Sequence, residues 1–296
     1  MHILLTGATG FVGSNLLPAL LERGHDVRAL TRDAEKGRAQ LDSRVEVVEG
    51  DILAPESLDG VFEDIDLAYY LIHSLYIGEE YEERDRMAAQ NFADQASEAG
   101  VDRVIYLGGL GETGEGLSKH LRSRREVEEV LRTGDYELTS FRAAIIVGAG
   151  SASFEMVRQM VSRLPVMITP KWVRTPSQPI AIRDVVEYLC EAAERPETAG
   201  ETLEIGGPEV LSYQQMMERT AAALGRRLTI FPVPVLTVKL SAYWIDLVTD
   251  TPRAISRPLI EGLKNPVVVT DDRAQKLIPI ELTPFDEALE RAIETQ

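Results

Sequence analysis

The sequence predicts an α/β protein with a doubly wound parallel sheet. Two observations lead to this prediction. Short apolar runs alternate with amphipathic helical segments over the first half of the chain, and a glycine-rich turn joins the first apolar run to the first helical segment. Hydrophobic residues make up 44% of the 296 residues and charged residues 27%, which is typical of a globular chain with a large core.

Six short apolar runs predict the strands of the sheet. They cover residues 3–5, 27–30, 45–49, 67–72, 104–107 and 138–142. Apolar residues at spacings of three and four predict helices over residues 12–23, 82–99 and 119–133. Gly24, Gly100 and Gly134 follow these segments, and glycine commonly ends a helix.

The pattern becomes less regular after about residue 150. Four prolines follow a helix predicted near residues 154–163, and later a strand is predicted at 202–205 and a helix at 213–224. We therefore expect an N-terminal domain over residues 1–150 and a smaller, partly intertwined lobe over residues 151–296. The apolar segment at 230–248 fits either a core or dimer surface, or the wall of a pocket for an apolar substrate.

The charge of the chain argues against nucleic acid as a partner. With 31 basic and 48 acidic residues the net charge is −17, whereas nucleic-acid binding needs a basic face. An acidic, Arg-rich surface is equally consistent with a high-salt cytoplasm and with a GC-rich genome. The sequence shows neither a signal peptide nor an apolar stretch of membrane-spanning length, so a cytoplasmic location is expected.

The polar residues favour neither a metal site nor a hydrolase. The four histidines include no pair at a ligand spacing, and Cys190 is the single cysteine, so we expect no metal centre and no disulfide. The nucleophile elbow of a serine hydrolase is also missing, because Gly148-Ala149-Gly150-Ser151 lacks the second flanking glycine.

The most informative motif is Thr6-Gly7-Ala8-Thr9-Gly10-Phe11-Val12-Gly13, which leaves the first strand and opens the first helix. In this context Gly7 suits a tight turn, Gly10 a close approach of backbone to a pyrophosphate, and Gly13 close packing of helix and strand. The motif predicts a Rossmann-type NAD(P)-binding domain, with a merely structural turn as the alternative. The expected cofactor-binding residues here are Gly7, Thr9, Gly10, Phe11, Val12 and Gly13.

The ends of later strands supply the rest of the expected cofactor site. Arg32 follows the second strand, where an arginine suits the 2′-phosphate of NADP and a carboxylate suits the ribose of NAD. Because Asp33 comes after Arg32 and does not replace it, NADP(H) is favoured over NAD(H). The alternative for Arg32 is a solvated loop charge. Asp51 and Ile52 are expected near the adenine, and Leu71, Ile72 and His73 at the end of the fourth strand are expected to line the cofactor.

Several blocks together resemble the extended and atypical short-chain dehydrogenase/reductase superfamily, which includes NmrA-like regulators and the NADPH-binding accessory subunit of respiratory complex I. Besides the glycine motif, these blocks are Gly50-Asp51-Ile52, Tyr70-Leu71-Ile72-His73-Ser74, Tyr106-Leu107-Gly108-Gly109-Leu110, residues 117–124, Gly150-Ser151-Ala152-Ser153-Phe154-Glu155, residues 178–182 and Gly206-Gly207-Pro208. They are most similar to a bacterial and archaeal branch of atypical members. The resemblance also places Ser151, Ser153, Glu155, Trp172 and Gln178 on the substrate side.

The resemblance implies that the usual catalytic relay is missing. Ordinary members use a Ser after the fifth strand and a Tyr and Lys four residues apart on the next helix. Gly108 and Gly109 occupy the Ser region here, while His120 stands at the Tyr position and Arg124 at the Lys position. His120 is a candidate acid/base, with Arg124 binding ribose or an anionic substrate. His73 is a further candidate, and Tyr69, Tyr70 or water are other proton sources.

These observations lead to three functional hypotheses. The first is an atypical NADP(H)-dependent reductase or dehydrogenase of a small or apolar organic substrate. The second is a non-catalytic NADP(H)-binding redox sensor or an assembly or accessory subunit, and the third is a nucleotide-sugar epimerase. For partners, we expect a small-molecule substrate, with a homodimer or a place in a larger complex as the alternatives for assembly.

Overall fold

A computed structural model describes residues 1–73, 81–111, 119–233 and 265–294, without the side chains of residues 119, 120, 171 and 172. Its larger part is built on a seven-stranded sheet in the order β3-β2-β1-β4-β5-β6-β11, and every pairing is parallel. The strands are β1 (His2–Thr6), β2 (Asp26–Thr31), β3 (Glu46–Glu49), β4 (Leu67–Tyr70), β5 (Arg103–Gly109), β6 (Glu137–Ala143) and β11 (Thr202–Ile205). The strand order changes direction between β1 and β4, and in such sheets ligands bind at the carboxyl ends beside this point.

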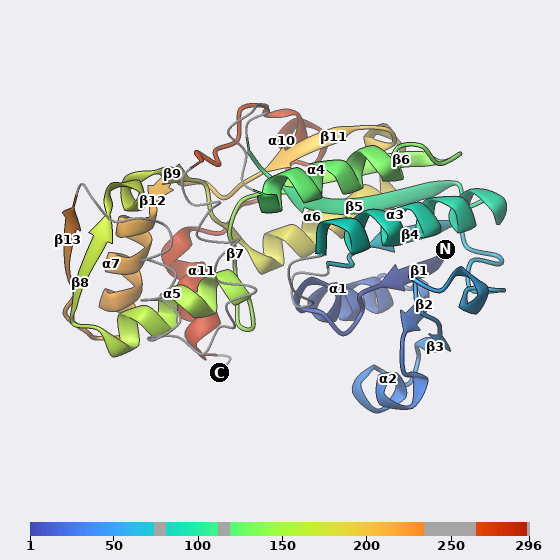
Figure 1. Cartoon of the computed structure of the whole chain (residues 1–296), viewed down its shortest axis with the longest axis horizontal. Coiled ribbons are helices and arrows are strands. Elements are labelled where there is room, and N and C mark those ends of the chain that lie inside the picture. The colour runs from blue at the N-terminus through green and yellow to red at the C-terminus, as the bar shows by residue number, and fades with distance from the viewer. Residues whose placement is uncertain (74–80, 112–118, 234–264, 295–296) are drawn as a thin grey trace.

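Helices cover both faces of the sheet (Figure 1). The helices α1 (Phe11–Glu22) and α6 (Ile182–Glu194) pack together on one face, and α3 (Tyr81–Glu98) and α4 (Lys119–Leu131) pack together on the other. The short helix α2 (Ala34–Gln40) lies beside β3. The predicted doubly wound α/β fold is therefore confirmed.

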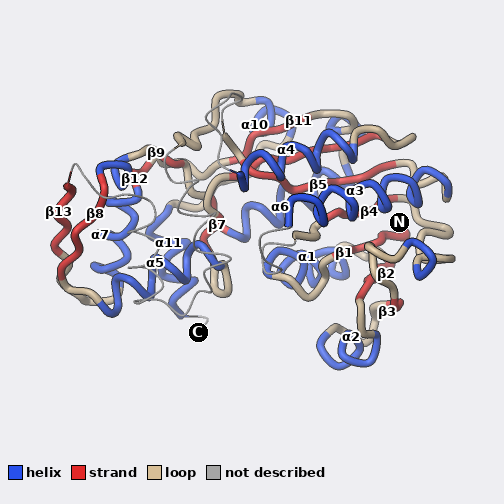
Figure 2. Tube along the Cα trace, viewed as in Figure 1, coloured by secondary structure: helices blue, strands red, loops and turns tan. Residues whose placement is uncertain are grey.

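A smaller lobe extends from the carboxyl edge of the sheet, at the left of Figure 2. It holds α5 (Ala152–Arg163), α7 (Tyr213–Ala223) and α11 (Phe285–Glu294), with β8 (Val166–Pro170) paired to β13 (Thr229–Val233). The described part of the chain also has the short strands β7 (Ile146–Val147), β9 (Pro176–Ser177), β10 (Ile180–Ala181) and β12 (Leu211–Ser212), and the helix α10 (Arg273–Leu277). A separate hydrophobic core joins α5, α7, α11 and β8.

The predicted strands and helices of the first half are all present, with ends shifted by a few residues. The second half is more interleaved than its local pattern indicates. β11 is the edge strand of the main sheet beside β6, and α6 covers that sheet, although both follow residue 150 in the chain. The domain boundary at 150 stays a prediction. Of the segment 230–248, only residues 230–233 are described, and they lie in β13.

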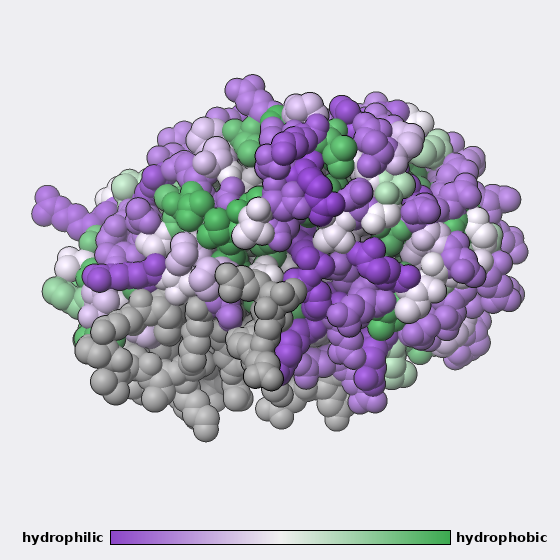
Figure 3. All heavy atoms as spheres, turned by 90° about the horizontal axis from the view of Figure 1, so that it is seen from above, coloured by the Kyte–Doolittle hydropathy of each residue, from purple (hydrophilic) through white to green (hydrophobic). Residues whose placement is uncertain are grey.

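Two surface properties bear on partners. Within the described part of the chain, no helix is both long and apolar enough to cross a bilayer. The face of the molecule seen in Figure 3 is mainly hydrophilic, with small hydrophobic areas among the polar side chains, in keeping with the net charge of −17.

Candidate functional site

The glycine turn between β1 and α1 is packed too closely to accept side chains. Gly7 has a φ of 72°, and a Cβ there would lie 2.8 Å from the Leu71 carbonyl oxygen at the end of β4. A Cβ on Gly13 would lie 2.2 Å from the Gly7 oxygen. Both contacts are far below van der Waals distance, so these two positions require glycine for steric reasons.

The same turn leaves the start of α1 open. The Gly10 N–H donates to the Gly7 oxygen at 2.9 Å, and Gly10 begins the helix without any side-chain cap. Thr9 and Gly10 are exposed. Uncapped N–H groups at a helix N-terminus carry positive potential and suit a phosphate. The residues present therefore fit a pyrophosphate.

The Phe11 side chain lies against a second turn that contains glycine. Its ring packs against the turn at Gly148 and Gly150, where a Cβ on Gly148 would lie 3.1 Å from Phe11 Cζ and 2.6 Å from Ile182 Cγ2. Gly150 has a φ of 86°. The Phe11 ring thus ties the glycine turn of the sheet domain to the segment that leads into α5.

Arg32 and Asp33 have separate environments at the end of β2. Asp33 caps α2, because its Oδ1 accepts from the Lys36 N–H at 2.9 Å. Arg32 is exposed and makes no hydrogen bond or ion pair with any described residue. The guanidinium is therefore available for a ligand, whereas one oxygen of the neighbouring carboxylate is already engaged by backbone.

The loop after β3 is held by its own side chains. Asp51 Oδ1 accepts from the Leu53 N–H at 3.0 Å, and the Ser57 hydroxyl accepts from the Asp51 N–H at 2.8 Å. Asn91 of α3 donates to the Ile52 oxygen at 2.8 Å. Asp51 and Ile52 thus sit in a hydrogen-bonded loop after β3, and their contact with adenine stays a prediction.

A polar cluster lies behind the end of β4. His73 Nδ1 is 3.1 Å from Asp85 Oδ2 of α3, and the Ser123 hydroxyl of α4 donates to the same oxygen at 3.3 Å. Asp85 and Ser123 are buried, while the His73 side chain keeps a quarter of its surface exposed. The buried carboxylate therefore orients the imidazole at the carboxyl edge of the sheet.

Arg124 links the carboxyl-terminal ends of β4 and β5 by hydrogen bonds. Its guanidinium donates to the Ile72 oxygen after β4 at 3.4 Å and also to the Leu107 oxygen of β5. It stacks over the Tyr106 ring, with Cζ 4.9 Å from the ring centroid, and only 8% of the residue is exposed. Arg124 is thus held in place by main-chain carbonyls near the crevice. Its predicted contact with ribose or an anionic substrate stays a prediction.

The imidazole of His73 is expected to titrate below its ordinary pKa of 6.5. Burial lowers the pKa, and the charge of Arg124 lowers it further, whereas Asp85 raises it. Asp85→Asn removes the raising contribution, so the His73 pKa should fall again. Proton NMR titration, with the resonance assigned from a His73→Gln variant, measures both values. A wild-type pKa at or above 6.5, or a rise in Asp85→Asn, would contradict this assignment.

Among the other candidate proton donors, Tyr69 and Tyr70 are buried. Tyr69 and Tyr70 point to opposite faces of the sheet and lie in different cores, and burial raises the pKa of both phenols well above 10. The Tyr69 hydroxyl donates to the Leu189 oxygen at 2.8 Å. Both side chains are almost completely buried, with 0% of Tyr69 and 1% of Tyr70 exposed. His120 lies in the first turn of α4, but its side chain, Ser74 and the Trp172 side chain are outside the described residues.

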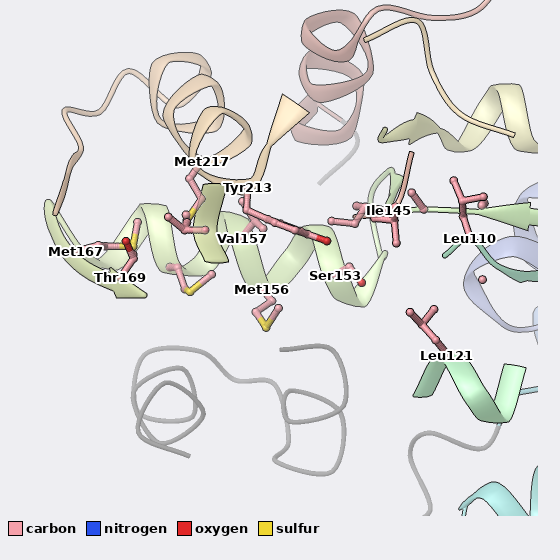
Figure 4. Close-up of a pocket in the computed structure, with 16 residues that line it drawn as sticks. Leu110, Leu121, Ile145, Ser153, Met156, Val157, Met167, Thr169, Tyr213 and Met217 are labelled. Atoms are coloured by element: carbon pink, nitrogen blue, oxygen red, sulfur yellow. The ribbon is translucent and has the colours of Figure 1, made fainter. Parts of the chain in front are cut away.

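An apolar pocket of about 170 Å³ joins the carboxyl edge of the sheet to the lobe. Figure 4 shows Leu110 and Leu121 at one end, Met167 and Thr169 at the other, and Tyr213 between them with its oxygen directed toward Ile145 and Ser153. Four of the seven methionines line it, namely Met156, Met160, Met167 and Met217. Methionine side chains adapt their shape, so this lining suits an apolar ligand.

The residues that the resemblance placed on the substrate side have different roles. Ser153 lines the pocket. Ser151 caps α5 and donates to the Ile146 oxygen at 2.7 Å, Glu155 pairs with Arg158 at 2.7 Å, and Gln178 donates to the Gly207 oxygen at 2.7 Å. These three side chains therefore also have roles in the protein's own packing.

Sequence reasoning missed most of the pocket and the partner of His73. Asp85 lies on a predicted helix and His73 follows a predicted strand, so no local pattern marks them as partners. Thr169 and Tyr213 come from elements far apart in the chain. The available signal was the clustering of Met156, Met160 and Met167 between Ser151 and Pro170. No group of three or more His, Cys, Asp or Glu side chains among the described residues could hold a metal ion.

Three curated proteins illustrate the range of similar sequences. UDP-glucose 4-epimerase of Vibrio cholerae is 23% identical over 268 residues, which cover 80% of each chain. Ceramide reductase of Caulobacter vibrioides is 30% identical over 168 residues, 56% of this chain and 52% of that enzyme. Subunit 9 of the NADH dehydrogenase [ubiquinone] 1 alpha subcomplex, mitochondrial, of Arabidopsis thaliana is 26% identical over 226 residues, 72% of this chain and 55% of that protein.

Structural similarity extends over almost the whole chain. The structure of Citrobacter sp. triphenylmethane reductase complexed with NADP(H) superposes with a TM-score of 0.80 at 20% identity, covering 98% of this chain and 99% of that one. At this identity the similarity establishes the shared fold. The NmrA-like family model matches residues 1–263, in agreement with the resemblance inferred from the motifs. The chain therefore belongs to the NmrA-like family.

Proposed function

We propose that this protein binds NADP(H) at the crevice beside β1 and β4 and acts as a reductase or dehydrogenase of an apolar organic substrate. The observation that carries the proposal is the methionine-rich pocket, which reaches Gly109 and Leu110 at the carboxyl end of β5 and Ala143 at the end of β6. In a doubly wound sheet this edge is where a dinucleotide lies. The cofactor, when bound, supplies or accepts the hydride.

The cofactor would be held by groups with distinct tasks. The glycine turn and the open N-terminus of α1 suit the pyrophosphate, and Leu71 to His73 form the wall of the crevice after β4. Arg32 suits a 2′-phosphate, since its guanidinium has no described partner and Asp33 is engaged at the cap of α2. Support for NADP(H) also comes from the NADP(H) complex of the structurally similar triphenylmethane reductase.

Proton handling is assigned to His73 with Asp85 as its positioning residue. The carboxylate holds the imidazole through Nδ1, and the lowered pKa keeps the ring neutral at neutral pH. A neutral imidazole acts as a general base toward an alcohol. The ring nitrogen available for this is Nε2, which is buried behind the end of β4. His120 remains a second candidate from the sequence. Individual His73→Gln and His120→Gln variants, measured as pH profiles of turnover, separate the two.

Arg32→Ala is expected to weaken NADPH binding by about 1.5–3 kcal/mol, the contribution of hydrogen bonds to a charged group, and to leave NADH binding nearly unchanged. Nicotinamide fluorescence titration of the purified protein measures both affinities. Arg44→Ala is the matched control, because Arg44 is an exposed arginine of the same domain that pairs with Asp42. Equal weakening of NADPH and NADH in Arg32→Ala would refute the NADP(H) preference, and no binding of either by wild type would refute the proposal.

The second candidate is a non-catalytic NADP(H) sensor or an accessory subunit. It is favoured by Gly108 and Gly109 at the usual Ser region and by an Arg124 guanidinium that main-chain oxygens already engage. The related complex I subunit is consistent with this reading. A sensor would bind NADPH and NADP with different affinities and show no substrate-dependent NADPH consumption, whereas a reductase would oxidise NADPH with an apolar aldehyde, ketone or enone.

The third candidate, a nucleotide-sugar epimerase, fits the pocket less well. The described residues that line it include no Lys or Arg, although a nucleoside diphosphate carries charges that such side chains neutralise. The similarity to UDP-glucose 4-epimerase covers most of both chains but at 23% identity. The pocket lining therefore favours an apolar substrate over a sugar nucleotide.

A further inference from the structure

The far end of the apolar pocket contains a buried hydroxyl for which the described residues supply no hydrogen-bond partner. Thr169 is 9% exposed, and its Oγ1 is buried with no hydrogen-bond partner among the described residues. It lies on β8 at the end of the pocket away from the sheet, next to Met167 (Figure 4). A buried polar group without a partner costs free energy, so its retention calls for a partner.

The strand geometry directs this hydroxyl into the pocket. Successive side chains of a strand point to opposite faces, and along β8 the residues alternate between exposed Val166 and Ile168 and buried Met167 and Thr169. Met167 and Thr169 therefore share the inner face. Thr169 pairs in register with Pro232 of β13, and proline has no backbone N–H that could donate a hydrogen bond.

Few other polar side chains occur among the described residues that line the pocket. Besides Thr169, the described lining has hydroxyls only on Ser153 and Tyr213, and both lie nearer to the sheet than Thr169 does (Figure 4). Burial raises the pKa of Tyr213 to about 12, so its hydroxyl is neutral at physiological pH. An apolar ligand that fills the pocket would thus meet one isolated hydroxyl at the end far from the sheet.

We propose that Thr169 recognises a polar group at the distal end of an elongated apolar substrate whose other end lies at Gly109 and Leu121. The substrate class is an aliphatic or alicyclic compound with an oxygen at each end. The end beside the sheet would react, and the oxygen at the other end would share a hydrogen bond with the Thr169 hydroxyl. The part of this inference that concerns the reacting end rests on the proposed function. The binding of the distal polar group depends only on the pocket.

The test measures binding without turnover. A homologous series of α,ω-alkanediols and the 1-alkanols of the same chain lengths are titrated calorimetrically into the full-length protein in the absence of cofactor. Wild type should bind the diol of one chain length about threefold to tenfold more tightly than the matching alkanol, as one net hydrogen bond predicts. Thr169→Val, which has the same shape without the hydroxyl, should lose that preference, and Thr169→Ser should keep it.

Stability supplies a second readout that is independent of the ligand. Because the hydroxyl has no described partner, Thr169→Val should leave the thermal unfolding midpoint unchanged or raise it. A marked fall would indicate a structural bond and overturn the proposal. The same diol preference in wild type and Thr169→Val would overturn it, as would failure of every alcohol to bind. Failure of the proposed function would be seen separately, as absence of NADPH binding in the fluorescence titration.

Discussion

Gly13→Ala is expected to destabilise the protein by about 3 kcal/mol and to reduce NADPH affinity at least about tenfold. The added Cβ would lie 2.2 Å from the Gly7 oxygen and 2.8 Å from Ala8 Cα, both main-chain atoms that no side-chain rotation can move. The helix α1 must therefore shift away from the turn, and its N–H groups leave the place where they would meet the pyrophosphate. Urea unfolding and nicotinamide fluorescence measure the two effects.

Gly24→Ala at the other end of α1 is the matched control. Gly24 has a φ of 79°, but a Cβ there meets nothing within 4 Å, so the cost is backbone strain of about 1 kcal/mol. Nucleotide affinity should be unchanged in this variant. If Gly13→Ala behaved like Gly24→Ala in both measurements, close packing at the turn would not be the reason for glycine, and the phosphate site would be in doubt.

Local sequence signals were sufficient for the first half of the fold. Each strand from β1 to β6 is a short run of apolar residues with helices between, and the chain order of strands and helices fixes which neighbours are parallel. The strand β11 was predicted at residues 202–205, but its place in the main sheet was not, and the helix α6 was not predicted. The four residues of β11 read as an isolated strand, and only pairing with residues 140–143 of β6 shows that it extends the main sheet. That pairing is set by tertiary contacts across about sixty residues of chain.

Some residues of the candidate site could likewise be identified from local sequence, and others only from tertiary contacts. Gly7, Gly13 and Arg32 could be identified from the sequence because their expected roles depend on a local turn or on the end of one strand. The contacts of Arg124 were not, since its guanidinium bonds to carbonyls of residues 72 and 107, which the sheet brings together. The pocket combines side chains of β5, α5, β8 and α7, so no window of sequence contains it. Hence the sequence indicated the cofactor side better than the substrate side.

Glu128→Gln is expected to cost about 3 kcal/mol of unfolding free energy, because it breaks a buried ion pair and leaves a charged partner uncompensated. Glu128 of α4 keeps 5% of its side chain exposed and accepts from Arg142 of β6 at 2.9 and 2.6 Å and from Arg132 at 3.2 Å. Glu129→Gln, at an exposed neighbouring position, should change stability by less than about 0.5 kcal/mol. Urea denaturation followed by circular dichroism compares the three proteins.

The pH dependence of this difference in unfolding free energy tests whether the ion pair with Arg142 is its cause. Burial by itself would raise the pKa of Glu128, but the hydrogen bonds and charge of Arg142 outweigh it and hold the pKa below the ordinary 4.5. A group with a depressed folded-state pKa contributes stability above its unfolded pKa and loses it as the pH falls through the folded value. The difference between wild type and Glu128→Gln should therefore be constant above about pH 5 and shrink below about pH 4.5. A difference that grew on acidification would show that the carboxylate is not stabilised by Arg142.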